Sequence, residues 1–250
     1  MKITAQPAFV LHSQAYKETS LLVDVLTRDY GRVSLVARGA RRPRADIRGA
    51  LLPFAPLTVD WFGKTELKTL ASVDWIGGQP QLSGTALLSG FYLNELLMRL
   101  LAKEDPHARI FRDYAQTVQA LAERRATIPV LLRRFEYALL VGLGYAPLLT
   151  VEADGITPIH AARDYLYRPS HGAIPRPAHL PRACPVSGET LLAIARDDFS
   201  QPHTQAEAKA LLRALLAEHL NGATLTSREI LETIQRCTMH AKNESARLTQ

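Results

Sequence analysis

Residues 36–56 read VARGARRPRADIRGALLPFAP and concentrate positive charge in a short stretch. Its five arginines are Arg38, Arg41, Arg42, Arg44 and Arg48, and a single aspartate lies among them. An arginine side chain keeps its charge and presents a planar fork that matches phosphate oxygens. Gly39 and Pro43 favour a turned or extended segment, so that the charges splay apart. This pattern predicts a loop that follows a nucleic-acid backbone, and the alternative is a solvated, flexible loop.

Aromatic residues that can stack on bases lie in the same part of the chain, namely Tyr16, Tyr30, Trp61, Phe62 and Trp75. On a strand, such residues belong to the core more often than to a binding surface. Their presence is compatible with nucleic-acid binding and does not require it.

A second basic group lies further along the chain. Arg133 and Arg134 are adjacent in an otherwise apolar helical stretch, so they point about 100° apart around the axis. One of them is expected at the edge of the helix, where it can hold a carboxylate. Lys209 and Arg213 are four residues apart and share a helix face. The alternative for these four residues is surface charge or internal ion pairing.

The residue types that bind zinc do not form a zinc motif. Cys184, His160, His171 and His179 fall in one segment, but no pair of cysteines has the short spacing of a structural zinc site. We therefore expect no metal and no cofactor.

Motifs for catalysis are also absent from the sequence. There is no phosphate-binding Walker loop, no G-x-S-x-G, no H-E-x-x-H and no G-x-G-x-x-G. Asp154, Asp197 and Asp198 are isolated acids, whereas a metal-dependent nuclease needs several converging carboxylates. We expect a protein that is not an enzyme.

Composition is that of a globular protein with a basic bias. Of its 250 residues, 47% are hydrophobic, enough for a core, and the formal net charge of +6 suits an acidic partner. No apolar run approaches the ~18 residues of a membrane span, and the N-terminus does not resemble a signal peptide. Two distant cysteines, Cys184 and Cys237, fit a reducing cytoplasm.

Five strands are expected before residue 80, at 8–14, 19–27, 32–38, 56–63 and 66–75. Turns at Asp29-Tyr30-Gly31 and Gly63-Lys64 join two pairs of them. A small closed antiparallel barrel leaves no exposed strand edge. A five-stranded barrel of this length is typical of the OB-fold, and an SH3-like barrel is the alternative.

Helical periodicity dominates after residue 80, which predicts an α+β protein with a β domain at 1–80 and a helical domain at 81–240. Helices are expected at 84–102, 107–125, 128–145, 188–197, 205–220 and 227–240. Ser187 is the expected cap of the fourth, and Thr204 with Glu207 forms a capping box for the fifth. Residues 146–186 hold seven prolines and form an irregular insert, with a hairpin near Tyr165–Gly172.

Six segments in order resemble one protein family, that of the bacterial recombination mediator RecO. They are FVLHSQAYKETSLLVDVLT, GRVSLVARGARRPR, GALLPFAPL, SGFYLNELLMRLL, LLRRFEYALLVGLGYAP and LTSREIL. The resemblance covers nearly the whole chain and is weakest at 150–200.

This resemblance implies an N-terminal OB-fold, a C-terminal helical domain, and binding and annealing of single- and double-stranded DNA. It also implies binding of the acidic, Phe-ended tail of the single-strand-binding protein SSB, and action with RecR in loading RecA, in the cytoplasm at the nucleoid. The loop that contains Arg38, Arg41, Arg42 and Arg44 corresponds to the family's DNA-contacting region. Arg133 or Arg134 corresponds to its SSB-tail site, which Lys209 and Arg213 would flank.

Many relatives carry a four-cysteine zinc module in the insert, whereas Cys184 stands alone here. This departure implies that the metal is lost and that Tyr165, Leu166, Tyr167 and prolines hold the insert together.

Two other functions are compatible with the residues. The first is a protein-interaction adaptor whose basic loop binds an acidic protein rather than DNA. The second is a hydrolase that uses acids and histidines of the insert, which would require metal-dependent turnover.

Overall fold

A computed structural model describes residues 2–43, 45–78, 80–176, 183–220, 223–227, 229, 230 and 233. The chain folds into two compact units, one comprising Met1–Pro106 with Thr224–Gln250 and the other His107–Ala223. In the first unit the elements are β1 (Lys2–Tyr16), β2 (Ser20–Thr27), β3 (Gly31–Ala37), α1 (Asp46–Ala50), β4 (Leu57–Phe62), β5 (Leu67–Trp75) and α2 (Gly84–Leu100).

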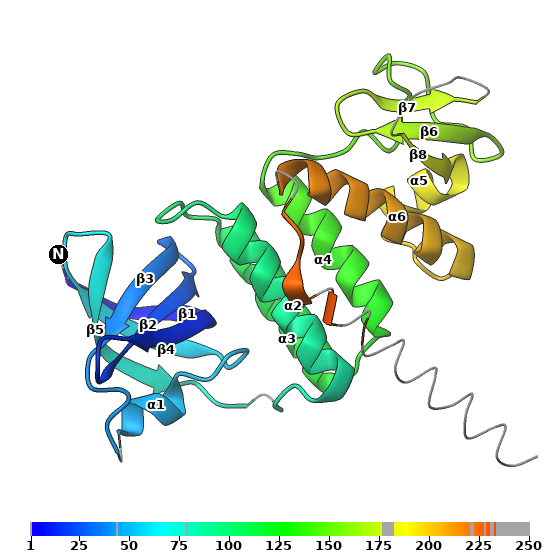
Figure 1. The fold of residues 1–250 in the computed structure, drawn as a ribbon. Helices are drawn as coiled ribbons and strands as arrows, with labels where there is room; N and C mark the ends of the chain where they lie inside the picture. Colours follow the sequence, from blue (N-terminus) through cyan, green and yellow to red (C-terminus); the bar gives the residue numbers. More distant parts are fainter. Residues whose placement is uncertain are drawn as a thin grey trace, which may run out of the picture. The chain divides into compact units, whose positions relative to one another are not determined.

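The first five strands form a closed barrel in the order β1-β2-β3-β5-β4 (Figure 1). Neighbouring strands are antiparallel except β3 and β5, which pair in parallel with Ser34 opposite Leu67. This arrangement confirms the predicted OB-fold. The predicted strands are all present, and β1 begins at Lys2 rather than at residue 8.

Strand β1 closes the barrel because it pairs with β2 along one part of its length and with β4 along another. Register shifts between Ile3 and Gln6 and between Val10 and His12 bend the strand, as bulges do. Inside, alternate residues such as Val25, Leu35, Leu57, Val59 and Trp61 are buried. Alternation in the sequence thus places one face of each strand in the core.

Helix α2 packs against β1 within the first unit. The buried amide of Asn94 donates to the Leu11 carbonyl at 2.8 Å, next to the second bulge. The compact units separate after Pro106, so α2 belongs with the barrel. The division of the chain at residue 80 into a β domain and a helical domain stays a prediction.

The second unit contains α3 (Ala108–Glu123), α4 (Ile128–Gly142), β6 (Asp164–Arg168), β7 (Gly172–Pro175), β8 (Cys184–Ser187), α5 (Gly188–Ala195) and α6 (Pro202–His219). Helix α4 packs against both α3 and α6. The buried rings of Tyr114 and Phe135 meet edge-on between α3 and α4, with centroids 6.2 Å apart. These helices confirm the predicted helical region.

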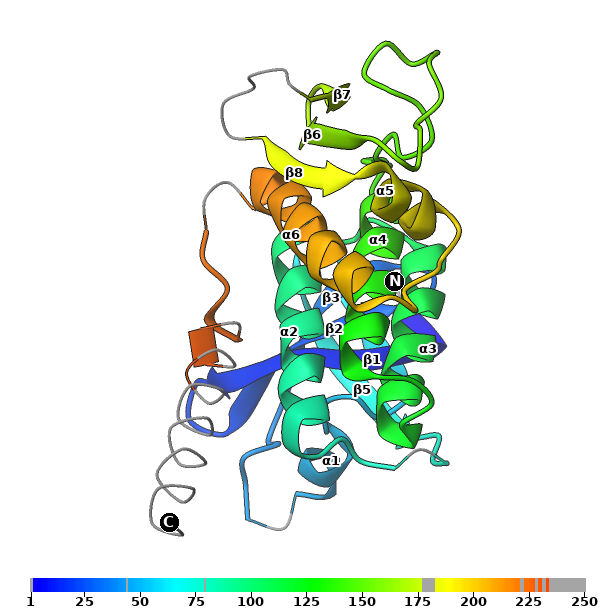
Figure 2. The same cartoon turned by 90° about the vertical axis from the view of Figure 1, so that its right-hand side faces the viewer.

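The insert forms a three-stranded sheet in the order β7-β6-β8, which confirms the predicted hairpin. Figure 2 shows β8 leading into α5 beside one end of α6. Tyr165 and Tyr167 are fully buried, and the Tyr165 hydroxyl accepts a hydrogen bond from the His160 amide at 2.9 Å. Tyrosines from β6 therefore hold this sheet together, as expected.

Ser187 caps α5 as predicted, since its side chain accepts from the Thr190 amide. The prediction that Thr204 and Glu207 form a capping box is wrong, because α6 begins at Pro202 with Gln201 as its N-cap. Pro202 suits the first helical turn because its missing N–H needs no partner there. Glu207 instead accepts hydrogen bonds from the amide and the hydroxyl of Ser187, at 3.0 and 2.7 Å.

Helix α6 ends at His219, and the expected stop at Asn221-Gly222 lies outside the described residues. Most of the predicted helix at 227–240 also lies outside them. Within the described part of the chain, no helix has the length and hydropathy needed to cross a bilayer.

Candidate nucleic-acid interface

Arginines gather on the connection between β3 and α1, which also contacts the turn between β1 and β2. The Arg41 amide donates to the Thr19 carbonyl at 2.9 Å, and the Arg41 guanidinium donates to the carbonyls of Lys17 and Glu18 at 3.2 Å. Buried Ala40 anchors the segment on the barrel. Arg41 is therefore held against the β1–β2 turn.

Local turns place the next residues of this loop. Gly39 has a φ of +71°, which glycine adopts without strain, and its carbonyl accepts from the Arg42 amide at 3.0 Å. Helix α1 follows, an element that the sequence pattern did not predict, and Arg48 lies in its last turn. Of the predicted DNA-binding residues, Arg38, Arg41, Arg42 and Arg48 are exposed, whereas Arg44 falls outside the described residues.

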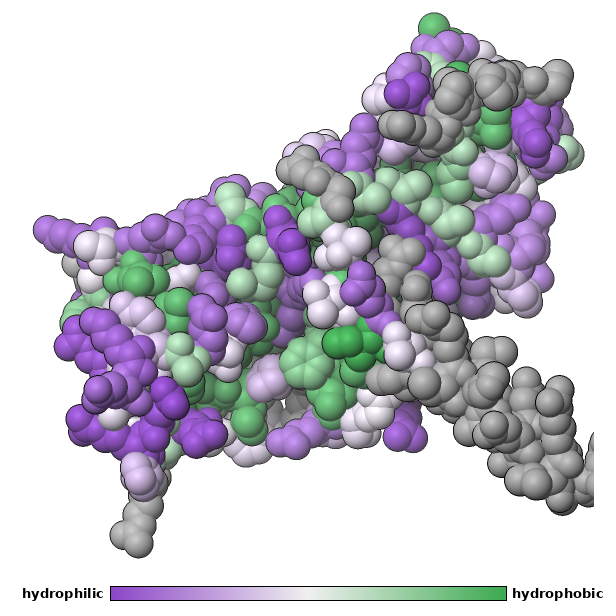
Figure 3. Space-filling model, viewed as in Figure 1, coloured by the Kyte–Doolittle hydropathy of each residue, from purple (hydrophilic) through white to green (hydrophobic). Residues whose placement is uncertain are grey.

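The loop arginines differ from other cations of the first unit in their lack of carboxylate partners among the described side chains. Several cations there have carboxylate partners, in the pairs Arg28–Asp29, Lys68–Glu104, Lys103–Glu66 and Arg99–Glu95. Among the side chains that the structure describes, none of the loop arginines has a carboxylate within ion-pair distance. Figure 3 shows the hydrophilic surface that gathers over this end of the barrel.

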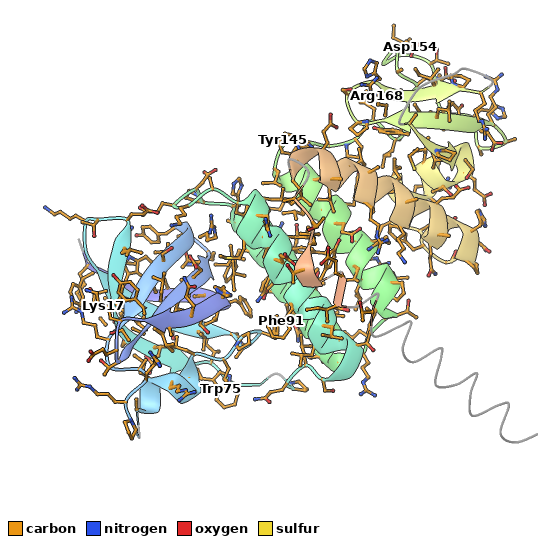
Figure 4. All side chains as sticks on the ribbon, viewed as in Figure 1. Lys17, Trp75, Phe91, Tyr145, Asp154 and Arg168 are labelled. Carbon is orange, nitrogen blue, oxygen red and sulfur yellow. The ribbon has the colours of Figure 1, made fainter. Side chains whose placement is uncertain are left out.

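Lys17 extends the basic surface and was not among the predicted residues. It lies in the β1–β2 turn that Arg41 contacts, and its ammonium lies 5.4 Å from the Tyr16 ring centroid (Figure 4). Its only signal in the sequence is a lysine between two predicted strands. We call Lys17, Arg38, Arg41, Arg42 and Arg48 the basic surface.

The five candidate aromatic residues separate into core and surface. Trp61 is 2% exposed and meets Tyr30 edge-on at 5.3 Å between centroids, so it belongs to the barrel core. Phe62 and Trp75 are exposed, and Tyr16 is half-buried. Phe62 and Trp75 are therefore the most accessible of the five rings.

The second basic group lies on α4 and α6, and its members differ in exposure. Arg133 is 5% exposed and forms a buried ion pair with Glu136 one turn away. Arg134 is exposed and donates to Asp197 at 2.8 Å. Lys209 is exposed on α6, and Arg213 is half-buried. Arg134 is thus the one that reaches the surface, but both adjacent arginines form internal ion pairs, which is the alternative stated for this group. A role for Arg134 in holding a ligand carboxylate stays a prediction.

Candidate zinc ligands are dispersed. His160 and His171 are exposed, Cys184 is half-buried in β8, and His179 lies outside the described residues. Burial, assisted by the nearby Glu207 carboxylate, raises the pKa of the Cys184 thiol, whereas zinc binds the thiolate. Across the described residues, no three metal-binding side chains converge.

Comparison with known proteins adds to this geometry. The family model "Recombination protein O N terminal" matches residues 1–79, and "Recombination protein O C terminal" matches residues 81–229. The DNA repair protein RecO of Laribacter hongkongensis is 50% identical over 235 residues, which cover 93% of this chain and 96% of that protein. That of Chromobacterium violaceum is 48% identical over 240 residues, 94% of this chain and 96% of that protein.

Proposed function

Because the chain belongs to the RecO family of DNA repair proteins, we propose that it binds single- and double-stranded DNA through the basic surface and anneals complementary strands. In this proposal it acts with RecR and SSB to help load RecA in recombinational repair. It works as a binding protein in the cytoplasm, without a catalytic site, metal or cofactor.

The observation that carries this proposal is the lack of ion-pair partners, within the described residues, for the arginines of the basic surface. A protein cation that already contacts a carboxylate must give up that contact to bind a phosphate. Among the described side chains, Arg38, Arg41, Arg42 and Arg48 have no such carboxylate contact to lose, so their binding to phosphates is favoured by the release of condensed counterions. Contacts to phosphates carry no base information, which supports sequence-independent binding.

Annealing follows from the same charges. Two complementary strands repel each other through their phosphates, and a dense set of guanidinium groups screens that repulsion when both strands bind nearby. Such a surface needs breadth rather than a deep cleft. The β3–α1 loop, the β1–β2 turn and α1 supply that breadth, since they present cations from three segments of the chain.

For the SSB tail, we propose that Arg134, Lys209 and Arg213 receive its carboxylates as charge-assisted hydrogen bonds. Arg134 is the candidate for direct contact because it is exposed. Arg133 is not a candidate for direct contact, since its guanidinium is buried in an ion pair with Glu136 of the same helix. Docking on the tail would raise the local concentration of the protein at SSB-coated DNA.

A salt titration tests DNA binding. The double variant Arg38→Glu/Arg42→Glu leaves Arg41 and its contacts with the turn in place. It should weaken binding to all sequences about equally and flatten the slope of log K against log salt by about one for each lost phosphate contact. The matched control is Arg28→Glu, at the opposite end of β2, which should leave the slope almost unchanged.

An unchanged slope in the double variant would remove the basic surface from DNA binding. If the wild-type protein fails to shift a poly-dT strand but binds an acidic protein, the adaptor function replaces this proposal.

A further inference from the structure

An apolar pocket of about 570 Å³ lies in the first unit, immediately after the basic surface in the chain. Its walls come from the end of α1, the segment that follows α1, the end of β5 and the start of α2. The lining includes Gly49, Leu52, Phe54 and Trp75. Neither the DNA-binding loop nor the tail site proposed above includes this pocket.

Trp75 is the exceptional residue of the lining. It is the last residue of β5 and is 62% exposed, although tryptophan is usually largely buried. Leu52, another lining residue, is also exposed, and Phe54 is buried against Phe91, with the two rings edge-on at 5.1 Å. The pocket thus has a buried aromatic residue in its lining and a large, accessible indole.

A positive charge comes directly before the pocket's lining residues in the chain. Arg48 is exposed in the last turn of α1, and the next two residues, Gly49 and Ala50, line the pocket. Helix α1 packs against β5, so Arg48 and Trp75 belong to adjoining elements, and Figure 4 shows Trp75 where β5 ends near α1. No carboxylate occurs among the described lining residues. The site therefore suits a ligand with a flat apolar part and an anionic part.

We propose that this pocket receives an unstacked base of single-stranded DNA, with the Trp75 indole as its stacking face and Arg48 on a neighbouring phosphate. The proposal rests on the DNA binding proposed above and adds a component specific to single strands. Every base has a π-face, so stacking on an aromatic side chain tolerates any sequence. Paired bases of a duplex are already stacked and cannot enter, so duplex DNA would contact the basic surface alone.

Two binding measurements on the full-length protein test this. Trp75→Ala should weaken binding to a fluorescein-labelled dT oligomer by about tenfold, the order of one stacking contact. Its affinity for a duplex with the same number of phosphates, and both salt slopes, should stay unchanged. Trp75→Phe should keep most of the single-strand affinity, because phenylalanine can also stack on a base. If Trp75 had only a structural role, Trp75→Ala would weaken single-strand and duplex binding alike.

Tryptophan fluorescence gives an independent readout. The sequence has two tryptophans, and Trp61 is buried in the barrel core, so quenching on addition of unlabelled dT oligomer should come from Trp75. The quenching should be lost in Trp75→Phe. Equal loss of single-strand and duplex affinity in Trp75→Ala, or no quenching in the wild type, would overturn the pocket assignment while leaving DNA binding intact.

Two further outcomes separate this inference from the function on which it rests. If an acidic peptide that ends in Phe quenches Trp75 and the dT oligomer does not, the pocket is a protein-docking site and the inference is wrong. If the wild type binds neither single strands nor duplex, the proposed function itself fails.

Discussion

The Arg134 guanidinium donates to the Asp197 carboxylate across 2.8 Å and so joins α4 to the residues just after α5. Both side chains are exposed, so water screens the pair and its contribution to stability is small, about 0–1 kcal/mol. An acidic ligand that uses Arg134 must compete with Asp197. The pair would then act as an internal competitor at the proposed tail site.

Asp197→Asn should therefore tighten binding of a labelled acidic, Phe-ended peptide by about twofold to fivefold, the range that an exposed ion pair allows. Asparagine tolerates the left-handed backbone at this position, where φ is +59°. Fluorescence anisotropy measures the change, and Asp198→Asn is the matched control because Asp198 accepts from the Ser200 amide instead. Identical affinities in the wild type, Asp197→Asn and Arg134→Ala would move the tail site elsewhere.

The buried pair of Arg133 and Glu136 predicts a stability effect that is separate from binding. Arg133→Ala leaves the fully buried Glu136 carboxylate without this cation, and removal of one member of such a pair costs about 3–5 kcal/mol. The double variant Arg133→Met/Glu136→Leu should restore most of that loss, because apolar residues need no charge partner there. Urea unfolding measures both.

If the urea midpoint of Arg133→Ala equals that of the wild type, the buried pair does not stabilise the fold. A tail-binding defect in that single variant would not identify a contact, because the fold is altered as well. The double variant is the informative one for peptide binding.

Acid should weaken the contact between Glu207 and Ser187. Partial burial alone would raise the pKa of Glu207, but hydrogen bonds from Thr190 and Ser187 outweigh it and hold the pKa below the ordinary value of 4.5. A carboxyl whose pKa is lower in the folded state stabilises the fold above its unfolded pKa, and loses that contribution as the pH falls through the folded value.

Glu207→Gln should therefore lower the free energy of unfolding at pH 7 by about 1 kcal/mol, after allowance for solvent screening, and by progressively less below about pH 4.5. Urea titrations at several pH values measure the difference. Glu218→Gln, exposed on the same helix, serves as the control and should change little at any pH. If Glu207→Gln lowers the free energy of unfolding by the same amount at every pH, this explanation is wrong.

Gly31 allows the turn before β3 to pass close to the chain after α2. Its φ is +63°, and a Cβ at this position would lie 2.0 Å from the Asp105 carbonyl oxygen. Gly31→Ala should lower the free energy of unfolding by at least about 2 kcal/mol. Alanine would strain the backbone at this positive φ, and its Cβ would displace the Asp105 backbone. Gly49→Ala is the control, since it has nothing within 4 Å and should be neutral or slightly stabilising. Thermal unfolding that is equal for the two variants would rule out the close approach.

The elements of this fold are predictable because their signals are local. Alternation of apolar residues marks the barrel strands, and the period of 3.6 marks α2, α3, α4 and α6. The errors arise where a distant residue competes with a local one. Glu207 has the spacing of a capping box, yet Ser187, twenty residues earlier, takes its carboxylate. Helix α1 has only five residues and is too short for a periodic signal.

Sequence alone determined the chemistry available to this protein, because the residue types do not depend on folding. Arginines crowded near residues 38–48, the alternating strands and the RecO resemblance are all properties of the chain itself. Tertiary structure decided which of those side chains are accessible to a ligand and which already have a partner within the protein. It buried Trp61 and exposed Trp75, and it paired Arg133 with Glu136 inside while Arg134 meets Asp197 at the surface. Burial and ion pairing depend on residues far apart in sequence, so no local pattern contains them.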